Sequence, residues 1–326
     1  MKKRLFGLLV IIAGLLFALA PTFAQLEVRV FPPPPPLESP IAGAIDFHVH
    51  AGPDVFGRSL TDLEVAKLAA RFGMRGLVIK NHVTSTADRA FLVNQLVPEI
   101  EVFGGIALNR AVGGVNPDAV EWMYRMSGGR GKIVWLPSFD ADHHLKTFNE
   151  PGEGLKVAEG SKVLPETEAV LKVIARENLI LATGHVSPEE VLAVSKRAKE
   201  LGVNYVVVTH AMADVPGLSI AQMKEAATMG AYLELIYLNH LMGPHAHLGW
   251  MRNWNQVSVS DMARAIKEIG AKHFILGTDL GQTGNPTHPD GLLKFVIGLK
   301  KAGIDQESLD LMMKKNPAKL LGLKDP

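Results

Sequence analysis

Short apolar runs alternate with amphipathic stretches from Ala44 to the end of the chain, and this alternation constrains the fold more than any other feature. Runs such as Leu77-Val78-Ile79 are apolar on both faces, as buried strands of a parallel sheet are. The alternation predicts eight strands, each followed by a helix, which is the pattern of a (β/α)8 barrel of the α/β class. A doubly wound open sheet is the alternative. The predicted strands are 44–50, 74–81, 101–108, 131–137, 179–184, 203–209, 231–238 and 273–279.

The segment before the first strand has the pattern of an export signal. Three basic residues precede an uncharged apolar run from Leu5 to Ala20, and small residues follow it. This pattern predicts a signal peptide over 1–24, cleaved after Ala24 or, as the alternative, after Ala20. An uncleaved membrane anchor is the competing interpretation, although the run is shorter than the roughly 20 residues of a span. The sequence therefore predicts an exported protein, either periplasmic or secreted, which meets a membrane only if this segment stays attached.

A proline-rich stretch separates this signal from the predicted barrel. Residues 25–41 contain five consecutive prolines, Pro32 to Pro36, which favour the extended polyproline II conformation. We predict a semi-rigid spacer over 25–41 and a barrel domain over 42–326.

The charge balance and the absence of cysteine narrow the partners. The chain has 34 basic and 33 acidic residues, a formal net charge of +1, so no field of one sign exists to attract nucleic acid. With no cysteine, a metal ion can be held only by nitrogen and oxygen donors. The expected partner is a small molecule, and the sequence does not indicate an oligomeric state.

The histidines gather at one end of the predicted strands. Of the twelve, only His273 lies at the beginning of a strand, and the other eleven end a strand or follow one. In a barrel these eleven meet at the C-terminal rim, where active sites form. His48 and His50 are two apart in the first strand and therefore face the same side. Two imidazoles so placed suit one divalent ion.

At this point the sequence resembles a known family. The segment Ile45-Asp46-Phe47-His48-Val49-His50 resembles the first-strand signature of the amidohydrolase superfamily, whose members are metal-dependent TIM-barrel hydrolases. The resemblance implies three further metal ligands, at the ends of the fifth, sixth and eighth strands. They are His185, His210 and Asp279. It also implies a C-terminal helix over 316–322.

The chain departs from that family at the fourth strand. Many members bridge two metal ions with a carboxylated lysine or a glutamate there, but this strand ends in Val134-Trp135-Leu136-Pro137. Lys80, at the end of the second strand, lies on the same predicted rim. We hypothesise that Lys80 is a carboxylated bridging ligand. The alternatives are a free ammonium that orients an anionic substrate, or an ion pair with Asp279.

The resemblance implies hydrolysis of an amide, ester, lactone or cyclic amide by a metal-activated water, with Asp279 as the general base. One or two divalent ions are expected, zinc first, with manganese, nickel or iron as alternatives. Two other functions remain open. One is metal-dependent decarboxylation on the same fold, and the other is non-catalytic binding of a metal or solute by an exported protein.

Predictions about the surroundings of the metal are less specific. His82, Arg110 and His240 are predicted to contact substrate, and Trp250, Trp254 and Tyr237 to form an apolar wall. Asp46 is expected to tie neighbouring strands together. Glu234, inside the seventh predicted strand, is a buried carboxylate that needs a partner the sequence does not reveal.

Overall fold

The computed structural model describes residues 39–324. The predicted signal peptide 1–24 and most of the predicted spacer 25–41 lie outside the described residues. Within residues 39–324 no helix has the length and apolar character needed to cross a membrane.

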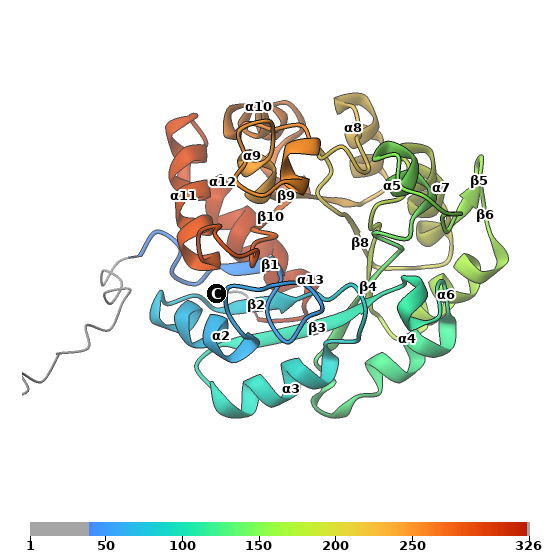
Figure 1. Cartoon of the computed structure of the whole chain (residues 1–326), viewed down its shortest axis with the longest axis horizontal. Helices are drawn as coiled ribbons and strands as arrows, with labels where there is room; N and C mark the ends of the chain where they lie inside the picture. The colour runs from blue at the N-terminus through green and yellow to red at the C-terminus, as the bar shows by residue number, and fades with distance from the viewer. Residues whose placement is uncertain (1–38, 325–326) are drawn as a thin grey trace, which may run out of the picture. The chain divides into compact units, whose positions relative to one another are not determined.

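Eight parallel strands form the sheet at the centre of the fold (Figure 1), in the order β1-β2-β3-β4-β7-β8-β9-β10. The sheet closes because β10 and β1 are linked at their C-terminal ends: the Asp279 N–H donates to the His48 carbonyl at 2.8 Å, and the His50 N–H to the Leu280 carbonyl at 3.0 Å. This closure confirms the predicted barrel and excludes the open sheet. All eight predicted strands are present: β1 (Ile45–Val49), β2 (Gly76–Ile79), β3 (Glu101–Ala107), β4 (Gly131–Trp135), β7 (Ile180–Ala182), β8 (Tyr205–Val208), β9 (Tyr232–Ile236) and β10 (Phe274–Gly277).

Helices surround the barrel and connect its strands (Figure 1). Several begin at polar residues that cap their first turn. The Ser187 side chain accepts a hydrogen bond from the Glu190 N–H at the start of α7, and Ser219 and Gln222 form the same capping box at α8. The helices are α2 (Asp62–Arg71), α3 (Ala87–Leu96), α4 (Pro117–Tyr124), α5 (Asp142–Thr147), α6 (Pro165–Arg176), α7 (Pro188–Glu200), α8 (Ile220–Thr228), α9 (Leu238–Leu241), α10 (Val259–Ile269), α11 (His288–Lys301), α12 (Gln306–Asp310) and α13 (Asn316–Leu320).

A bulge in β1 allows two consecutive residues of this strand to face the interior of the barrel. The pairing with β2 shifts by one residue between Asp46 and Val49. Phe47 packs in the inner core of the barrel, and yet the next residue, His48, also contacts side chains of the interior. Strict alternation would send these two neighbours to opposite faces. The extra residue of the bulge lets Phe47 fill the barrel while His48 and His50 reach the rim.

Two long connections leave the C-terminal ends of strands. The connection after β4 contains α5 and a small antiparallel hairpin of β5 (Ala158–Glu159) and β6 (Lys162–Val163). The connection after β9 contains α9 and a 3-10 turn, Trp250–Asn253.

The chain ends with the predicted C-terminal helix, α13, which follows a π-helical turn at Leu311–Lys315. Ala318, Leu320 and Leu321 join the inner core of the barrel, and the Asn316 side chain donates to the Phe274 carbonyl at 2.7 Å. Because Phe274 begins β10, α13 packs against the N-terminal end of the barrel. The histidine cluster lies at the opposite, C-terminal end of the barrel.

Candidate metal centre

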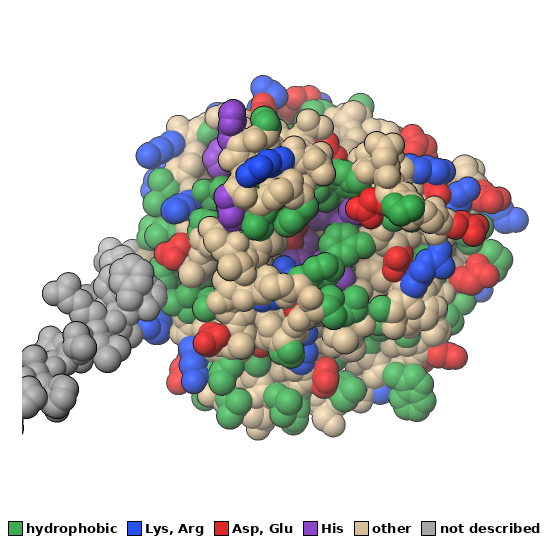
Figure 2. All heavy atoms as spheres, in the orientation of Figure 1, with side chains coloured by type: hydrophobic (Ala, Val, Ile, Leu, Met, Phe, Trp, Pro, Cys, Tyr) green, Lys and Arg blue, Asp and Glu red, His purple; other side chains and the backbone are tan. Residues whose placement is uncertain are grey.

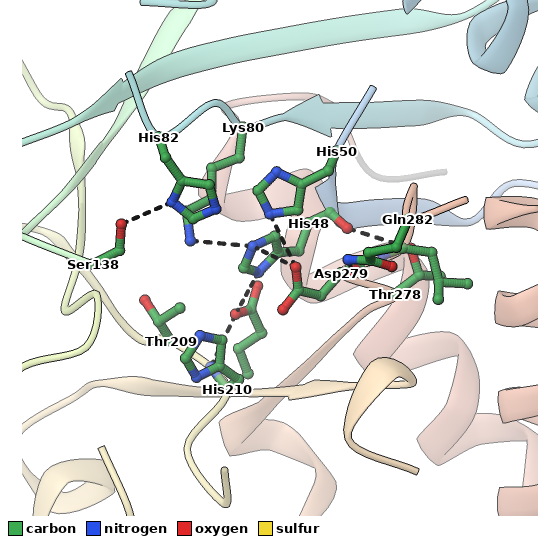
Figure 3. Close-up of polar contacts among 12 residues, drawn as sticks. His48, His50, Lys80, His82, Ser138, Thr209, His210, Thr278, Asp279 and Gln282 are labelled. Carbon is green, nitrogen blue, oxygen red and sulfur yellow. Dashed lines mark hydrogen bonds and ion pairs between the residues drawn. The ribbon is translucent and has the colours of Figure 1, made fainter. Parts of the chain in front are cut away.

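Two imidazoles and one carboxylate converge at the C-terminal ends of β1 and β10 (Figure 3). The Asp279 Oδ1 atom lies 3.0 Å from His50 Nε2 and 3.3 Å from His48 Nε2. All three residues are buried, and one ligand atom from each lies within 4.8 Å of the other two. This is the only such group of three or more His, Asp or Glu side chains in residues 39–324.

The backbone is strained where it directs two of the predicted ligands. His210 has φ 30° and Asp279 φ 54°, left-handed values that non-glycine residues rarely adopt. Hydrogen bonds hold both: the His210 N–H donates to Glu234 Oε2 at 3.0 Å, and the Asp279 N–H to the His48 carbonyl. Strain of this kind is characteristic of functional sites, where the surrounding structure maintains it.

Glu234 of β9 has its partners at this centre. Its Oε2 lies 3.1 Å from His48 Nδ1 and also accepts the His210 N–H. Burial raises the pKa of Glu234 to about 8, against the lowering effects of the His210 N–H and of Lys80. Because Glu234 Oε2 already accepts the His210 N–H, it acts as an acceptor towards His48 as well, so the proton of His48 lies on Nδ1 and its lone pair on Nε2.

The donor set fits a divalent cation. With its proton on Nδ1, His48 faces Asp279 Oδ1 with a lone pair, so two acceptors stand 3.3 Å apart. Burial lowers the pKa of His48 to about 3 and holds that of His50 well below its usual value, so both rings are neutral at neutral pH. Neutral imidazole nitrogen with carboxylate oxygen is the donor set of zinc and similar ions in proteins.

Lys80, at the end of β2, reaches the same point. Its side chain is fully buried, with Nζ 3.2 Å from His48 Nε2 and 5.5 Å from the centre of the Trp135 ring. Burial lowers the pKa of Lys80, while the nearby Asp279 and Glu234 oppose that shift. The structure therefore brings Lys80 to His48 Nε2, the same nitrogen that faces Asp279.

His185 and His210 lie side by side next to this cluster. Their Nε2 atoms are 3.2 Å apart, and the His210 ring stacks on His48 at 6.0 Å between centroids. The other nitrogen of His185, Nδ1, lies 2.8 Å from Nδ1 of His144 in α5. All six predicted ligands thus lie in one cluster. His144 is a partner that sequence reasoning did not select, although it belongs to the histidines of the rim.

His82, a predicted substrate residue, borders the cluster. Its ring stacks between His50, at 4.8 Å, and Phe139, at 4.1 Å, and its Nδ1 lies 2.8 Å from Ser138 Oγ. Burial holds the pKa of His82 well below its usual value.

The other two predicted substrate residues have their side-chain contacts outside the cluster. The Arg110 guanidinium is exposed and donates to the carbonyl of Glu153 in the connection after β4. His240, in α9, is partly exposed and makes its ring contact with Tyr237. Neither side chain has a hydrogen bond or ring contact with the six predicted ligands.

Aromatic side chains border the approach to the histidines. Trp254 packs on Phe148 at 4.5 Å between centroids and reaches His185 at 6.3 Å, and Trp250 packs on Trp254. Phe139 and Phe56 contact each other at 5.7 Å beside His82. Figure 2 shows histidine side chains at the bottom of a hollow on this face, with apolar side chains around it. Tyr237, which the sequence predicted for this wall, packs on Phe295 of α11 instead.

One protein-family model matches the sequence. It is described as a family of unknown function (DUF6282) and covers residues 43–234, more than half of the chain. The match begins just before β1 and ends at Glu234, so it contains every residue of the cluster except Asp279. No curated protein matches the sequence.

Solved structures with a similar fold include two kinds of hydrolase. An organophosphorus hydrolase from Deinococcus radiodurans aligns with a TM-score of 0.56 at 16% identity, covering 85% of this chain and 92% of that one. A mutant of a Deinococcus radiodurans PTE-like lactonase aligns with a TM-score of 0.56 at 15% identity, covering 87% and 97%. At this identity the likeness shows the barrel fold, and function has to be argued from the site.

Proposed function

The chain belongs to the family of unknown function DUF6282, and from that premise we propose that it is a metal-dependent hydrolase of the amidohydrolase type. The observation that carries the proposal is the convergence of His48 Nε2, His50 Nε2 and Asp279 Oδ1 at the C-terminal rim of a (β/α)8 barrel. Barrel enzymes place their chemistry at this rim. The fold similarity to an organophosphorus hydrolase and a lactonase supports the same reaction class.

The residues divide between two ion sites. His48, His50 and Asp279 would hold one divalent ion, and His185 and His210 would hold a second. Such an ion lowers the pKa of a bound water and polarises a carbonyl or phosphoryl oxygen.

Asp279 performs the proton transfer in this proposal. Its carboxylate accepts a proton from the attacking water as the water oxygen bonds to the acyl carbon or phosphorus. The bond to the leaving oxygen or nitrogen then breaks, and Asp279 passes the proton to that atom. Glu234 keeps the proton of His48 on Nδ1, and the aromatic side chains around the hollow limit access of bulk water.

Esters and lactones are the substrates to test first, followed by phosphotriesters and amides. The similar structures include a lactonase and an organophosphorus hydrolase, and both reactions need an activated water and a polarised oxygen. The apolar border of the hollow suits uncharged substrates.

Lys80 is proposed as the group between the two ion sites. A bound cation and the Lys80 ammonium cannot both use the lone pair of His48 Nε2, which lies 3.2 Å from Nζ. Carboxylation removes the positive charge of the amine and supplies two oxygen donors. The full burial of Lys80 lowers its pKa and so favours the neutral amine, the form from which a carbamate is made.

Bicarbonate should then raise the bound metal from one ion per chain to two, and Lys80→Gln should stay at one. A single ion in the wild type with saturating bicarbonate would contradict the bridge.

The function is tested by metal analysis together with a panel of lactones, esters, phosphotriesters and amides. We expect bound divalent metal, activity on at least one ester or lactone, and a loss of kcat of about 10³-fold or more in Asp279→Asn when it is assayed at saturating metal. Asp88→Asn, at an exposed position in the first turn of α3, is the matched control and should behave as the wild type. Metal binding with full activity in Asp279→Asn would refute the general-base role, and metal binding without any turnover would favour a binding protein.

A further inference from the structure

His82 is a buried imidazole with a fixed ring and no step in the proton transfer described above. It follows β2, is 5% exposed, and is held between the rings of His50 and Phe139 at interplanar angles of 17° and 28°. Its role therefore depends on which of its two nitrogens carries a proton.

A buried hydrogen-bond network determines which nitrogen of His82 carries the proton. It begins at Asn109, after β3. Its Nδ2 group donates to the His82 carbonyl at 2.9 Å and to Ser138 Oγ at 2.8 Å. Its Oδ1 atom accepts the Ser138 N–H at 2.8 Å. The opposite orientation of the amide would set oxygen against the His82 carbonyl and nitrogen against the Ser138 N–H, so the hydrogen bonds fix which atom is which.

The Ser138 hydroxyl connects Asn109 to the His82 ring. Its hydroxyl is fully buried and has two partners in residues 39–324, Asn109 Nδ2 and His82 Nδ1. Because the oxygen accepts from Asn109, its single hydrogen is free for His82 Nδ1 at 2.8 Å. If Nδ1 donated instead, the buried Ser138 O–H would have no acceptor, which is the costly arrangement.

The lone pair of His82 is therefore on Nδ1 and its proton on Nε2. The hydrogen on Nε2 does not depend on the charge of the ring, since a protonated imidazole carries hydrogen on both nitrogens. Nε2 has no hydrogen-bond partner within the described residues. Figure 3 shows the ring beside Lys80 and His50, with Ser138 on its far side from the cluster.

We propose that His82 presents its Nε2–H group as a hydrogen-bond donor to a substrate oxygen at the metal centre, in the orientation set by Asn109 and Ser138. The ligand is a molecule with an acceptor oxygen, such as the carbonyl of an ester or lactone or the oxygen of a phosphoryl group. The donor is fixed before the substrate arrives, so it stabilises charge that develops on that oxygen without reorganisation. The inference rests on the proposed function for the reaction, while the position of the proton rests on the hydrogen bonds alone.

The position of the proton is tested without any turnover. Long-range ¹H–¹⁵N NMR spectra of the zinc-loaded full chain, labelled at histidine, report which nitrogen of each ring is protonated. The His82 resonances are identified by their loss in His82→Gln. We expect a protonated Nε2 and an unprotonated Nδ1, and a mixture of both neutral forms in Ser138→Ala. A wild-type ring with its proton on Nδ1 alone would overturn the inference.

Inorganic phosphate serves as the ligand probe in the same experiment. Its oxygens should shift the His82 Nε2–H resonance in the zinc-loaded wild type, and the shift should be smaller in Ser138→Ala. A saturating phosphate concentration that shifts the resonances of neighbouring histidines but leaves His82 Nε2–H unchanged would contradict the donor role.

Kinetics test the contribution of the donor to the reaction, with 4-nitrophenyl acetate and δ-valerolactone as substrates. His82→Phe keeps the stacking and removes the N–H, and should lower kcat about 10²- to 10³-fold with a much smaller change in KM. Ser138→Ala should lower kcat about tenfold. Ser195→Ala, which removes a buried hydroxyl in α7, should change neither value.

Wild-type kcat in a metal-loaded His82→Phe would overturn the proposal. If neither substrate is turned over by the wild type, the hydrolase function is in doubt, and the NMR experiments still decide the inference.

Discussion

At the scale of single residues, three histidine rings of the centre each have a buried partner at the Nδ1 atom. Glu234 contacts Nδ1 of His48, His144 contacts Nδ1 of His185, and Ser138 contacts Nδ1 of His82. Such partners orient a ring and determine which nitrogen is free to bind. The chemistry of the centre therefore depends on residues that would not themselves touch a metal.

Glu234→Gln tests this dependence directly. The amide keeps the shape of the side chain but replaces one of the two oxygens with an NH₂ donor, which weakens the acceptor facing His48 Nδ1. We expect metal affinity to fall about 10- to 100-fold, measured by competition with a chelator of known affinity. Glu225→Gln, at an exposed position in α8, should bind metal as the wild type does. Equal affinities for Glu234→Gln and the wild type would show that Glu234 does not orient His48.

At the scale of the elements, the sequence predicted the strands well because buried parallel strands are short apolar runs between caps and turns. The positions of the predicted metal ligands followed, since all of them end strands of one barrel. What the sequence could not show depends on how distant elements align. His48 and Glu234 are 186 residues apart, and they meet because β1 has a bulge and β9 places Glu234 toward the interior.

The other residues that sequence reasoning missed also depend on how elements distant in the sequence align. His144 and Phe139 belong to the connection after β4, whose internal structure, α5 and the β5–β6 hairpin, has no periodic pattern to read. The hydrogen bonds of Asn109 join two loops 29 residues apart. Arg110 follows Asn109 directly, but its guanidinium donates to the Glu153 carbonyl, away from the centre.

Glu190 links two elements, and its replacement should loosen one of them. Its Oε2 accepts the Ser187 N–H at the start of α7, and its Oε1 accepts the Val157 N–H beside the β5–β6 hairpin, both at 2.9 Å. Glu190→Ala should lower the free energy of unfolding by about 1–2 kcal/mol and speed amide hydrogen exchange at Val157 and Ala158.

Glu189→Ala is the control for this change, because the neighbouring Glu189 is exposed in the same helical turn. It should leave hydrogen exchange at the hairpin unchanged. Equal exchange at Val157 in both variants would mean that Glu190 does not hold the hairpin.

At the scale of the whole molecule, the interior carries many imidazoles that are neutral when the chain is folded. Burial lowers the pKa of His288 and of His144 to about 4, and of His210 to about 3. These three rings bind protons near pH 6.5 in the unfolded chain but not in the folded chain. The stability these groups contribute is therefore present above pH 6.5 and is lost as the pH falls towards their folded values.

This linkage predicts an acid-sensitive metal-free protein. The free energy of unfolding, from urea titrations, should fall steadily between pH 6.5 and pH 4, with His288 alone contributing on the order of 3 kcal/mol. His288→Gln should flatten the dependence, because Gln does not titrate, whereas His245→Gln at an exposed position should not. A pH dependence that is the same in His288→Gln as in the wild type would contradict this assignment.

Export is a separate prediction for the whole chain. In a host with a general secretion pathway, cleavage after Ala24 should give a mature protein that begins at Gln25, which intact-mass measurement and N-terminal sequencing can check. A purified membrane-bound protein that still begins at Met1 would favour the uncleaved anchor, and an N-terminus at Pro21 would favour the alternative cleavage site.

The metal centre of His48, His50 and Asp279 is the claim on which the proposed hydrolase depends. Anomalous diffraction from crystals of the zinc-loaded protein, recorded above and below the zinc edge, tests it directly. We expect a zinc peak about 2.0–2.2 Å from His48 Nε2, His50 Nε2 and a carboxylate oxygen of Asp279. Fully occupied crystals with zinc bound elsewhere, or zinc-saturated protein with no peak at these three residues, would contradict the claim.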